Sequence, residues 1–212
     1  KYFTSVTIVP LIYFLTHSMF TKLELNWAAP IFYGGAFILM MDIDGNRQYM
    51  RTYYLQIIYS FVLIITIMIQ TFFPLLPLNT KSDPTNRYYM YETLLQDTKK
   101  IIENPDYHNY RVVSNNFQIP SMVNFYLNPS LESICLSIDY HETLYSFLYT
   151  NKDIKGKDFI FIYNKNYFPN NIKKYFSDYE LIDTSVQNRN GDIINEYTIW
   201  LVKNYSGKNN LF

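Results

Sequence analysis

Hydrophobic residues fill three long segments in the first third of the chain, and shorter apolar runs alternate with polar stretches in the rest. The long segments are residues 2–20, 27–41 and 53–78, and the third has no charged residue. About twenty apolar residues are enough to cross a bilayer as a helix. We therefore expect about three transmembrane helices in residues 1–78. The alternative is that these segments are buried core helices of a soluble protein.

Residues 79–212 show the pattern of a separate α/β domain. Helical periodicity or helix-like composition covers residues 91–104, 118–127, 142–149 and 170–178. Short apolar or alternating runs predict strands at 111–114, 133–138 and 158–163, and a closing hairpin at 179–187 and 196–204. Strands that alternate with helices predict a small α/β sandwich with a mainly parallel sheet and an antiparallel edge.

Charge and cysteine content narrow the class of protein. The chain has 18 basic and 18 acidic residues, so its balance gives no electrostatic footprint for nucleic acid. Its single cysteine, Cys135, leaves no internal disulfide to form. Because Cys135 lies within an apolar run, we expect a small buried hydrophobe rather than a reactive thiol.

The loops between the apolar segments predict an orientation. Residues 42–51 contain Arg47 and Arg51, whereas the loop of residues 22–27 contains only Lys22 as a basic residue. The positive-inside rule places residues 42–51 in the cytoplasm. The sequence thus predicts a multi-pass protein of the inner (cytoplasmic) membrane, with the 22–27 loop and the α/β domain on the extracytoplasmic side.

Polar residues follow the first two predicted strands of the domain. Asn115 and Gln118 come after the first, and Asp139 and His141 come after the second. Ligands of open α/β sheets collect beyond the carboxyl ends of parallel strands, so these four residues are a candidate second site. The alternative is that they are ordinary polar loop residues. No second histidine lies nearby in the sequence to complete a metal site, and we expect none.

Four stretches in order along the chain resemble one family of membrane enzymes. They read KLELNWAAPIFYGG (22–35), DPTNR (83–87), VVSNNFQIPSMVNFYLN (112–128) and GKDFIFIY (156–163). They resemble glycosyltransferase-39-like integral membrane proteins, relatives of the dolichyl-phosphate-mannose protein mannosyltransferases and of the bacterial lipid A aminoarabinose transferase. Within DPTNR, we expect Asp83 and Arg87 to pair with each other or to cap the helix that starts near Tyr88. After the second strand the family's arginine and Asn-Gln-Tyr triplet are replaced by DYHETLYS.

The resemblance implies an enzyme that moves a sugar from a polyprenyl-phosphate donor to an extracytoplasmic acceptor. In this picture Lys22 and Asn26 contact the donor phosphate or sugar, because cations stabilise a departing lipid phosphate. Glu24 orients Lys22, and Trp27 stacks on a sugar or sits at the headgroup level. The alternatives are a snorkelling cation for Lys22 and a plain interfacial anchor for Trp27.

The resemblance covers only the carboxyl-terminal portion of such an enzyme, the end of a GT-C-type helix bundle with its α/β domain. The family's catalytic carboxylate lies in a first extracytoplasmic loop that this sequence does not contain. We therefore expect this segment to contain no catalytic residue and no cofactor. We also expect it to be inactive on its own and to depend on amino-terminal membrane helices that it lacks. Whether the full-length enzyme uses a divalent metal stays open. Its expected partners are the lipid bilayer and the polyprenyl-phosphate-linked sugar. The alternatives are a membrane-anchored extracytoplasmic binding module without catalysis and a gene remnant.

Overall fold

The computed structural model describes residues 2–19, 36, 47–80, 83–138 and 143–207. The chain divides into two units, Lys1–Ile69 and Gln70–Phe212, and each is described by itself. We call them the helical unit and the α/β unit. The division falls inside the third apolar segment, whereas the sequence-based boundary lies between residues 78 and 79.

The helical unit contains α1 (Tyr2–Ser18) and most of α3 (Arg47–Phe72). Among the described residues, only Tyr53–Phe72 is both long and apolar enough to cross a membrane. The prediction of about three transmembrane helices is therefore wrong for the described chain. At 1.5 Å per residue α1 is roughly 25 Å long, which is shorter than the hydrocarbon core of about 30 Å, and its apolar part is only Thr7–His17. The segment 27–41 lies, except for residue 36, outside the described residues.

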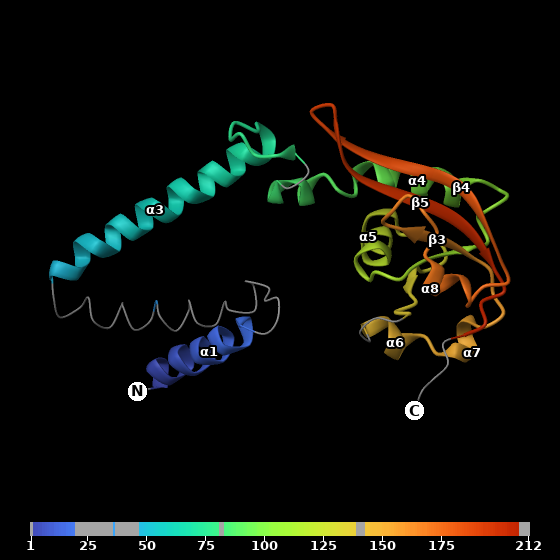
Figure 1. Ribbon diagram of the computed structural model, residues 1–212, viewed down its shortest axis with the longest axis horizontal. Helices are drawn as coiled ribbons and strands as arrows, with labels where there is room; N and C mark the ends of the chain where they lie inside the picture. The colour runs from blue at the N-terminus through green and yellow to red at the C-terminus, as the bar shows by residue number, and fades with distance from the viewer. Residues whose placement is uncertain (1, 20–35, 37–46, 81–82, 139–142, 208–212) are drawn as a thin grey trace. The chain divides into compact units, whose positions relative to one another are not determined.

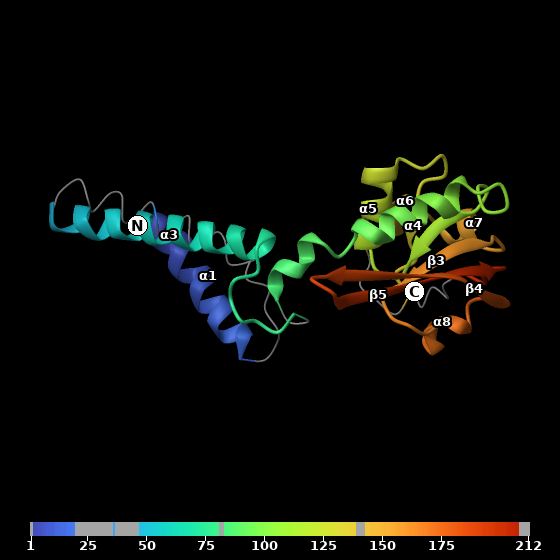
Figure 2. The same ribbon diagram turned by 90° about the horizontal axis from the view of Figure 1, so that it is seen from above.

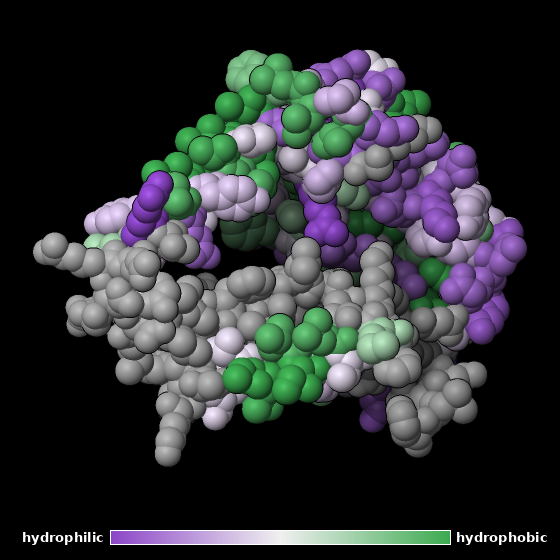
Figure 3. Space-filling model, turned by 60° about the vertical axis from the view of Figure 1, so that its left-hand side comes forward, coloured by the Kyte–Doolittle hydropathy of each residue, from purple (hydrophilic) through white to green (hydrophobic). Residues whose placement is uncertain are grey.

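From Tyr53 onward helix α3 has no charged residue, and two of its hydroxyl groups bond within the helix. Ser60 Oγ donates to the carbonyl of Gln56 at 2.9 Å, and Thr66 Oγ1 donates to the carbonyl of Val62 at 2.7 Å. Hydrophobic side chains accordingly cover the surface of this helix (Figure 3). The helix ends at Phe72 because Pro74, two residues later, has no N–H to continue the ladder.

The α/β unit is built on a five-stranded sheet in the order β2-β1-β3-β5-β4 (Figure 1). Its strands are β1 (Arg111–Ser114), β2 (Ile134–Cys135), β3 (Phe159–Tyr163), β4 (Asp178–Arg189) and β5 (Asp192–Lys203). β1 pairs in parallel with β2 and β3, whereas β5 is antiparallel to both β3 and β4. The prediction of a mainly parallel sheet is wrong, because the long hairpin inserts β5 beside β3 and supplies most of the ladder. The sheet is mixed.

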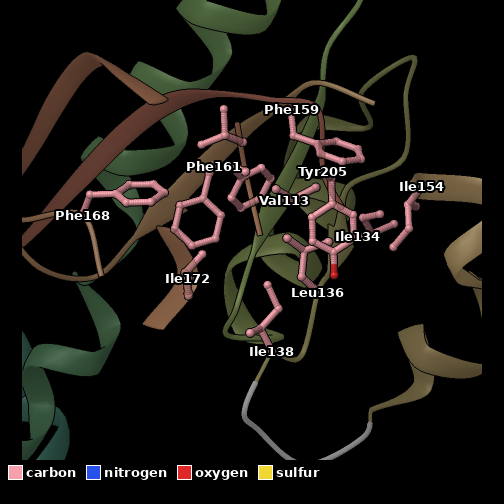
Figure 4. Packing of buried hydrophobic residues seen from close by; sticks show 12 residues of the cluster. Val113, Ile134, Leu136, Ile138, Ile154, Phe159, Phe161, Phe168, Ile172 and Tyr205 are labelled. Carbon is pink, nitrogen blue, oxygen red and sulfur yellow. The ribbon is translucent and has the colours of Figure 1, made fainter. Parts of the chain in front are cut away.

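Helices cover both faces of this sheet. They are α4 (Glu92–Glu103), α5 (Gln118–Leu127), α6 (Leu144–Leu148), α7 (Asn151–Ile154) and α8 (Asn170–Lys173), and the short helix η3 (Pro84–Tyr88) precedes α4. Successive side chains of a strand point to opposite faces, so β3 contributes to two cores. Ile160 and Ile162 pack with α4 and α5, while Phe159 and Phe161 pack with α7 and α8. Figure 4 shows the second of these cores.

The β4–β5 hairpin extends well beyond the carboxyl end of the parallel strands. The last residue of β3, Tyr163, pairs with Thr198, and β5 continues from there back to Asp192. At about 3.3 Å per residue this arm is roughly 20 Å long. Its turn residues Asn190 and Gly191 both have positive φ, 53° and 89°, as a tight two-residue hairpin turn requires. The tip therefore reaches residues far from the body of the sheet.

Candidate functional site

A buried ion pair joins the hairpin tip to the segment that follows α3. The side chains of Arg189 and Asp83 are only 5% and 4% exposed, and Arg189 Nη1 lies 3.3 Å from Asp83 Oδ2. Asp83 also accepts from Gln70 Nε2 at 2.8 Å and from the backbone N–H of Thr85 at 2.9 Å. Asp83 thus caps η3, which ends at Tyr88, and not a helix that starts there as predicted. Its cationic partner is Arg189 rather than Arg87.

The other donors of Arg189 are directed at the end of α3, whose last three residues belong to the α/β unit. Nη2 donates to the backbone carbonyls of Gln70 at 2.6 Å and Thr71 at 2.9 Å, and Nη1 donates to Asn86 Oδ1 at 2.8 Å. The last carbonyls of a helix lack partners within the helix and carry its partial negative charge. A buried guanidinium at this point satisfies both requirements. We call this group of residues the Arg189 cluster.

The surroundings of Asp83 keep it charged. Burial alone would raise its pKa, but the hydrogen bonds from Thr85 and Gln70 and the positive charge of Arg189 outweigh burial and lower the pKa below its ordinary value. The two charges therefore compensate each other, and both terminal nitrogens of Arg189 and both oxygens of Asp83 have hydrogen-bond partners. Such a pair can fasten the hairpin to the chain that leaves α3.

Asn115, a predicted site residue, forms hydrogen bonds with the backbone. Its side-chain amide donates to the carbonyl of Ile138 at 2.8 Å, and its side-chain oxygen accepts from the N–H of Ile138. These two hydrogen bonds join the loop after β1 to the segment after β2. Asn115 lies at the carboxyl edge of the sheet, as predicted, but its polar atoms are engaged in holding that edge together.

Gln118, the other described member of the predicted second site, is exposed at the start of α5. Its Oε1 accepts from Asn116 Nδ2 at 3.3 Å and from Tyr91 Oη at 3.4 Å, which are weak contacts. Burial raises the pKa of the Tyr91 hydroxyl, although the positive charge of Arg87 acts against this, so the hydroxyl stays protonated and able to donate. The loop after β1 therefore presents an exposed amide beside a tyrosine hydroxyl, which is chemistry for hydrogen bonding to a polar ligand.

The remaining predicted site residues lie outside the described part of the chain. These are Lys22, Glu24, Asn26 and Trp27 of the first loop, and Asp139 and His141 after β2. Within the described residues, no group of three histidine, cysteine, aspartate or glutamate side chains could hold a metal ion.

A small pocket lies at the opposite, amino edge of the sheet, where no site was predicted. Its volume is about 210 Å³, and it opens between the end of α4, the start of β1 and the end of α5. Val112 and Leu127 supply apolar lining, while Glu103, His108 and Asn128 supply polar groups. The lining is mixed in character, and the volume is below the roughly 300–1,000 Å³ of common small-molecule sites, so only a small polar ligand would fit.

Sequence reasoning missed both the Arg189 cluster and this pocket. In the sequence Arg189 stands in the stretch NRNGD (188–192), between the two strands of the predicted hairpin. No pattern of neighbouring residues indicates that it pairs with Asp83, which lies in a distant part of the chain. The pocket forms because three elements meet, and no single motif encodes it. No family model, curated protein or solved structure matches this chain.

Proposed function

We propose that this chain is the carboxyl-terminal, membrane-anchored part of a glycosyltransferase that moves a sugar from a polyprenyl-phosphate donor to an extracytoplasmic acceptor. The observation that carries the proposal is the junction at the end of α3. Helix α3 has the length and composition of a membrane span, and its last residues, Gln70 and Thr71, are hydrogen-bonded by Arg189 of the α/β unit. A domain fastened in this way begins at the membrane boundary, the depth at which the headgroup of a polyprenyl-phosphate sugar lies.

The roles of the first loop in this proposal rest on its resemblance to the transferase family. Lys22 and Asn26 bind the donor phosphate or sugar, Glu24 orients Lys22, and Trp27 stacks on the sugar. A positive charge at this depth stabilises the phosphate that leaves when the glycosidic bond breaks. The acceptor's proton goes to a carboxylate base, which the family places in a loop that this sequence does not contain.

The test is sugar transfer by the native membrane protein that contains this sequence, purified and reconstituted with polyprenyl-phosphate sugars. Lys22→Ala and Asn26→Ala are expected to abolish transfer, because each removes a contact to the donor. Lys99→Ala is the matched control, since Lys99 is exposed on α4 and forms only a surface pair with Glu103. Transfer that survives both loop substitutions would contradict the roles assigned to the loop.

A second function, a membrane-anchored binding module without catalysis, is favoured by the pocket at the amino edge of the sheet. Its apolar lining and its polar groups, Glu103, His108 and Asn128, match the two surfaces of a saccharide ring, which has apolar C–H faces and a hydroxyl periphery. Saturation-transfer NMR with methyl glycosides tests this function. Signals that Glu103→Gln weakens and Glu92→Gln leaves intact would support it, because Glu92 lies at the other end of the same helix. No saturation transfer from the folded chain would rule it out for these sugars.

A further inference from the structure

Two helices of the α/β unit end at the small pocket on the amino edge of the sheet. Helices α4 and α5 lie on the same face of the sheet (Figure 2) and pack into one core there. The chain enters β1 from the end of α4 and returns from β1 along α5, so both helices have their carboxyl ends at the amino edge. Their last residues, Glu103 and Leu127, both line the pocket.

The ends of these helices favour positive charge in the pocket. The carboxyl end of a helix carries about half a negative charge, because its last carbonyls have no partner within the helix. Helix α5 ends at Asn128 in the left-handed conformation (φ 43°), after which a backbone N–H commonly donates back to the helix. The next residue is Pro129, which has no N–H to donate. The last carbonyls of α5 therefore keep acceptor capacity for a donor in the pocket.

The side chains of the pocket act in the same direction. Glu103 contributes a carboxylate, and Tyr110 contributes an aromatic ring, whose face attracts cations. His108 Nδ1 lies 2.6 Å from the carbonyl oxygen of Pro105, which can only accept, so Nδ1 holds the proton and Nε2 of the neutral ring is an acceptor. Among the described residues that line the pocket, none is a lysine or an arginine. The lining therefore suits a ligand that is positively charged and donates hydrogen bonds.

Glu103 has one cationic partner, and the contact is weak. Lys99 Nζ lies 3.8 Å from Glu103 Oε1, and the two side chains are 59% and 64% exposed. Water and salt screen such a pair, so it contributes little. Lys99 does not line the pocket, and a cation that enters the pocket can replace it as the partner of Glu103.

We propose that this pocket binds a small organic ammonium ion. The charged group lies between the Glu103 carboxylate and the ends of α4 and α5, and the apolar part of the ligand contacts Val112 and Leu127. The volume of about 210 Å³ restricts the ligand to a small molecule. The inference concerns the pocket of the second function and goes beyond that function, because recognition of the charge requires no saccharide ring.

The test titrates the full chain in detergent micelles, at neutral pH and constant ionic strength, with n-butylammonium chloride and with 1-butanol, which has the same tail and no charge. The readout is the NMR signal of His108 in a chain that contains carbon-13-labelled histidine, assigned by its loss in His108→Gln. The proposal predicts a saturable shift with n-butylammonium, at an affinity at least several-fold higher than that of 1-butanol. Glu103→Gln should weaken n-butylammonium binding on the order of fivefold, as expected for a partly exposed ion pair, and Glu92→Gln, at the other end of α4, should leave it unchanged.

A second pair of variants adds a charge instead of removing one. Ser130→Lys places a competing cation at the pocket and is expected to weaken n-butylammonium binding. Asn166→Lys adds the same charge in the loop after β3, at the carboxyl edge of the sheet, and should have no effect. Both positions are exposed, so both variants are expected to fold.

Equal affinities for n-butylammonium and 1-butanol would overturn the proposal, as would binding that neither Glu103→Gln nor Ser130→Lys weakens. A titration with methyl glucoside separates this inference from the second function. A shift of the His108 signal with methyl glucoside but not with n-butylammonium would refute ammonium binding and leave saccharide binding. The reverse result would support ammonium binding and refute saccharide binding for this sugar, and no shift with either ligand would refute both.

Discussion

The Arg189 cluster offers the sharpest quantitative test of how the α/β unit is held together. Arg189→Met keeps the length and most of the volume of the side chain but removes its charge and all of its donors. It leaves the Asp83 carboxylate buried without its cationic partner. It also removes the Arg189 donor to the carbonyl of Gln70 and one of two side-chain donors to the carbonyl of Thr71, which still accepts from Tyr89 Oη at 2.9 Å. Breaking a buried pair by removing one member costs about 3–5 kcal/mol. This is a large part of the roughly 5–15 kcal/mol that stabilises a typical domain.

The control is an ion pair of the same kind on the surface. Lys203 Nζ lies 3.5 Å from Asp178 Oδ2, but the two side chains are 45% and 62% exposed. Water and salt screen such a pair, so Lys203→Met is expected to change the free energy of unfolding by only about 0–1 kcal/mol. The two substitutions replace similar side chains in the same hairpin, and they differ mainly in burial.

The assay is urea unfolding of the full chain in detergent micelles, followed by near-ultraviolet circular dichroism. In the α/β unit Phe168 stacks on Tyr179 and Trp200 meets both rings edge to face, and this aromatic group gives the unit its own signal. The shift of the midpoint multiplied by the slope gives the change in unfolding free energy. The reasoning is refuted if Arg189→Met is no more destabilising than Lys203→Met.

A double-mutant cycle separates the pair itself from its surroundings. Asp83→Asn removes the buried charge that Arg189→Met leaves uncompensated. The double variant is therefore expected to be less destabilised than the sum of the two single variants, with a coupling free energy of about 1–3 kcal/mol. Strict additivity would mean that Arg189 acts only through the carbonyls of α3 and its neutral partners.

Three further predictions concern single residues. Because the pKa of Asp83 is lowered in the folded state, its contribution to stability is present above its ordinary pKa of 3.8 and is lost as pH falls through the lower folded value. Urea midpoints between pH 2 and 7 should thus fall more steeply at acid pH in the wild type than in Asp83→Asn; parallel curves would contradict this. Asn115→Ala should destabilise the α/β unit by about 1–3 kcal/mol, because it leaves the backbone N–H and carbonyl of Ile138 without their side-chain partner. A shift of the urea midpoint no larger than that of Lys203→Met would contradict this structural role of Asn115. Cys135, 6% exposed, should react with maleimide only in urea, and rapid labelling of the folded chain would contradict its burial.

Local signals in the sequence were sufficient for most elements of the α/β unit. The β-branched and aromatic run at residues 159–163 forms β3, the amphipathic pattern after Tyr91 forms α4, and the Asn190-Gly191 pair forms the predicted hairpin turn. These features depend on neighbours along the chain, which a single sequence displays directly. Helix α7 was missed because its four residues are too few for a periodic signal.

The errors concern relations between distant segments. The residue pattern of 192–203 does not indicate that β5 pairs with β3, and this pairing between distant segments makes the sheet mixed. Hydropathy alone likewise did not show that α1 would stop at Ser18, short of a membrane's thickness. The contact of Asn115 with the backbone was not predicted for the same reason, since its partner Ile138 follows a different strand. The residue type at a strand end does not show whether its side chain binds a ligand or the protein backbone.

The most direct test of the central claim is to incubate the native membrane protein that contains this sequence with a radiolabelled polyprenyl-phosphate sugar and extracytoplasmic acceptors. A transferase releases polyprenyl phosphate in step with the appearance of labelled acceptor, and the account predicts that Lys22→Ala stops both. Saccharide binding by the α/β unit with no release of polyprenyl phosphate from any donor would contradict the transferase and leave the anchored binding module.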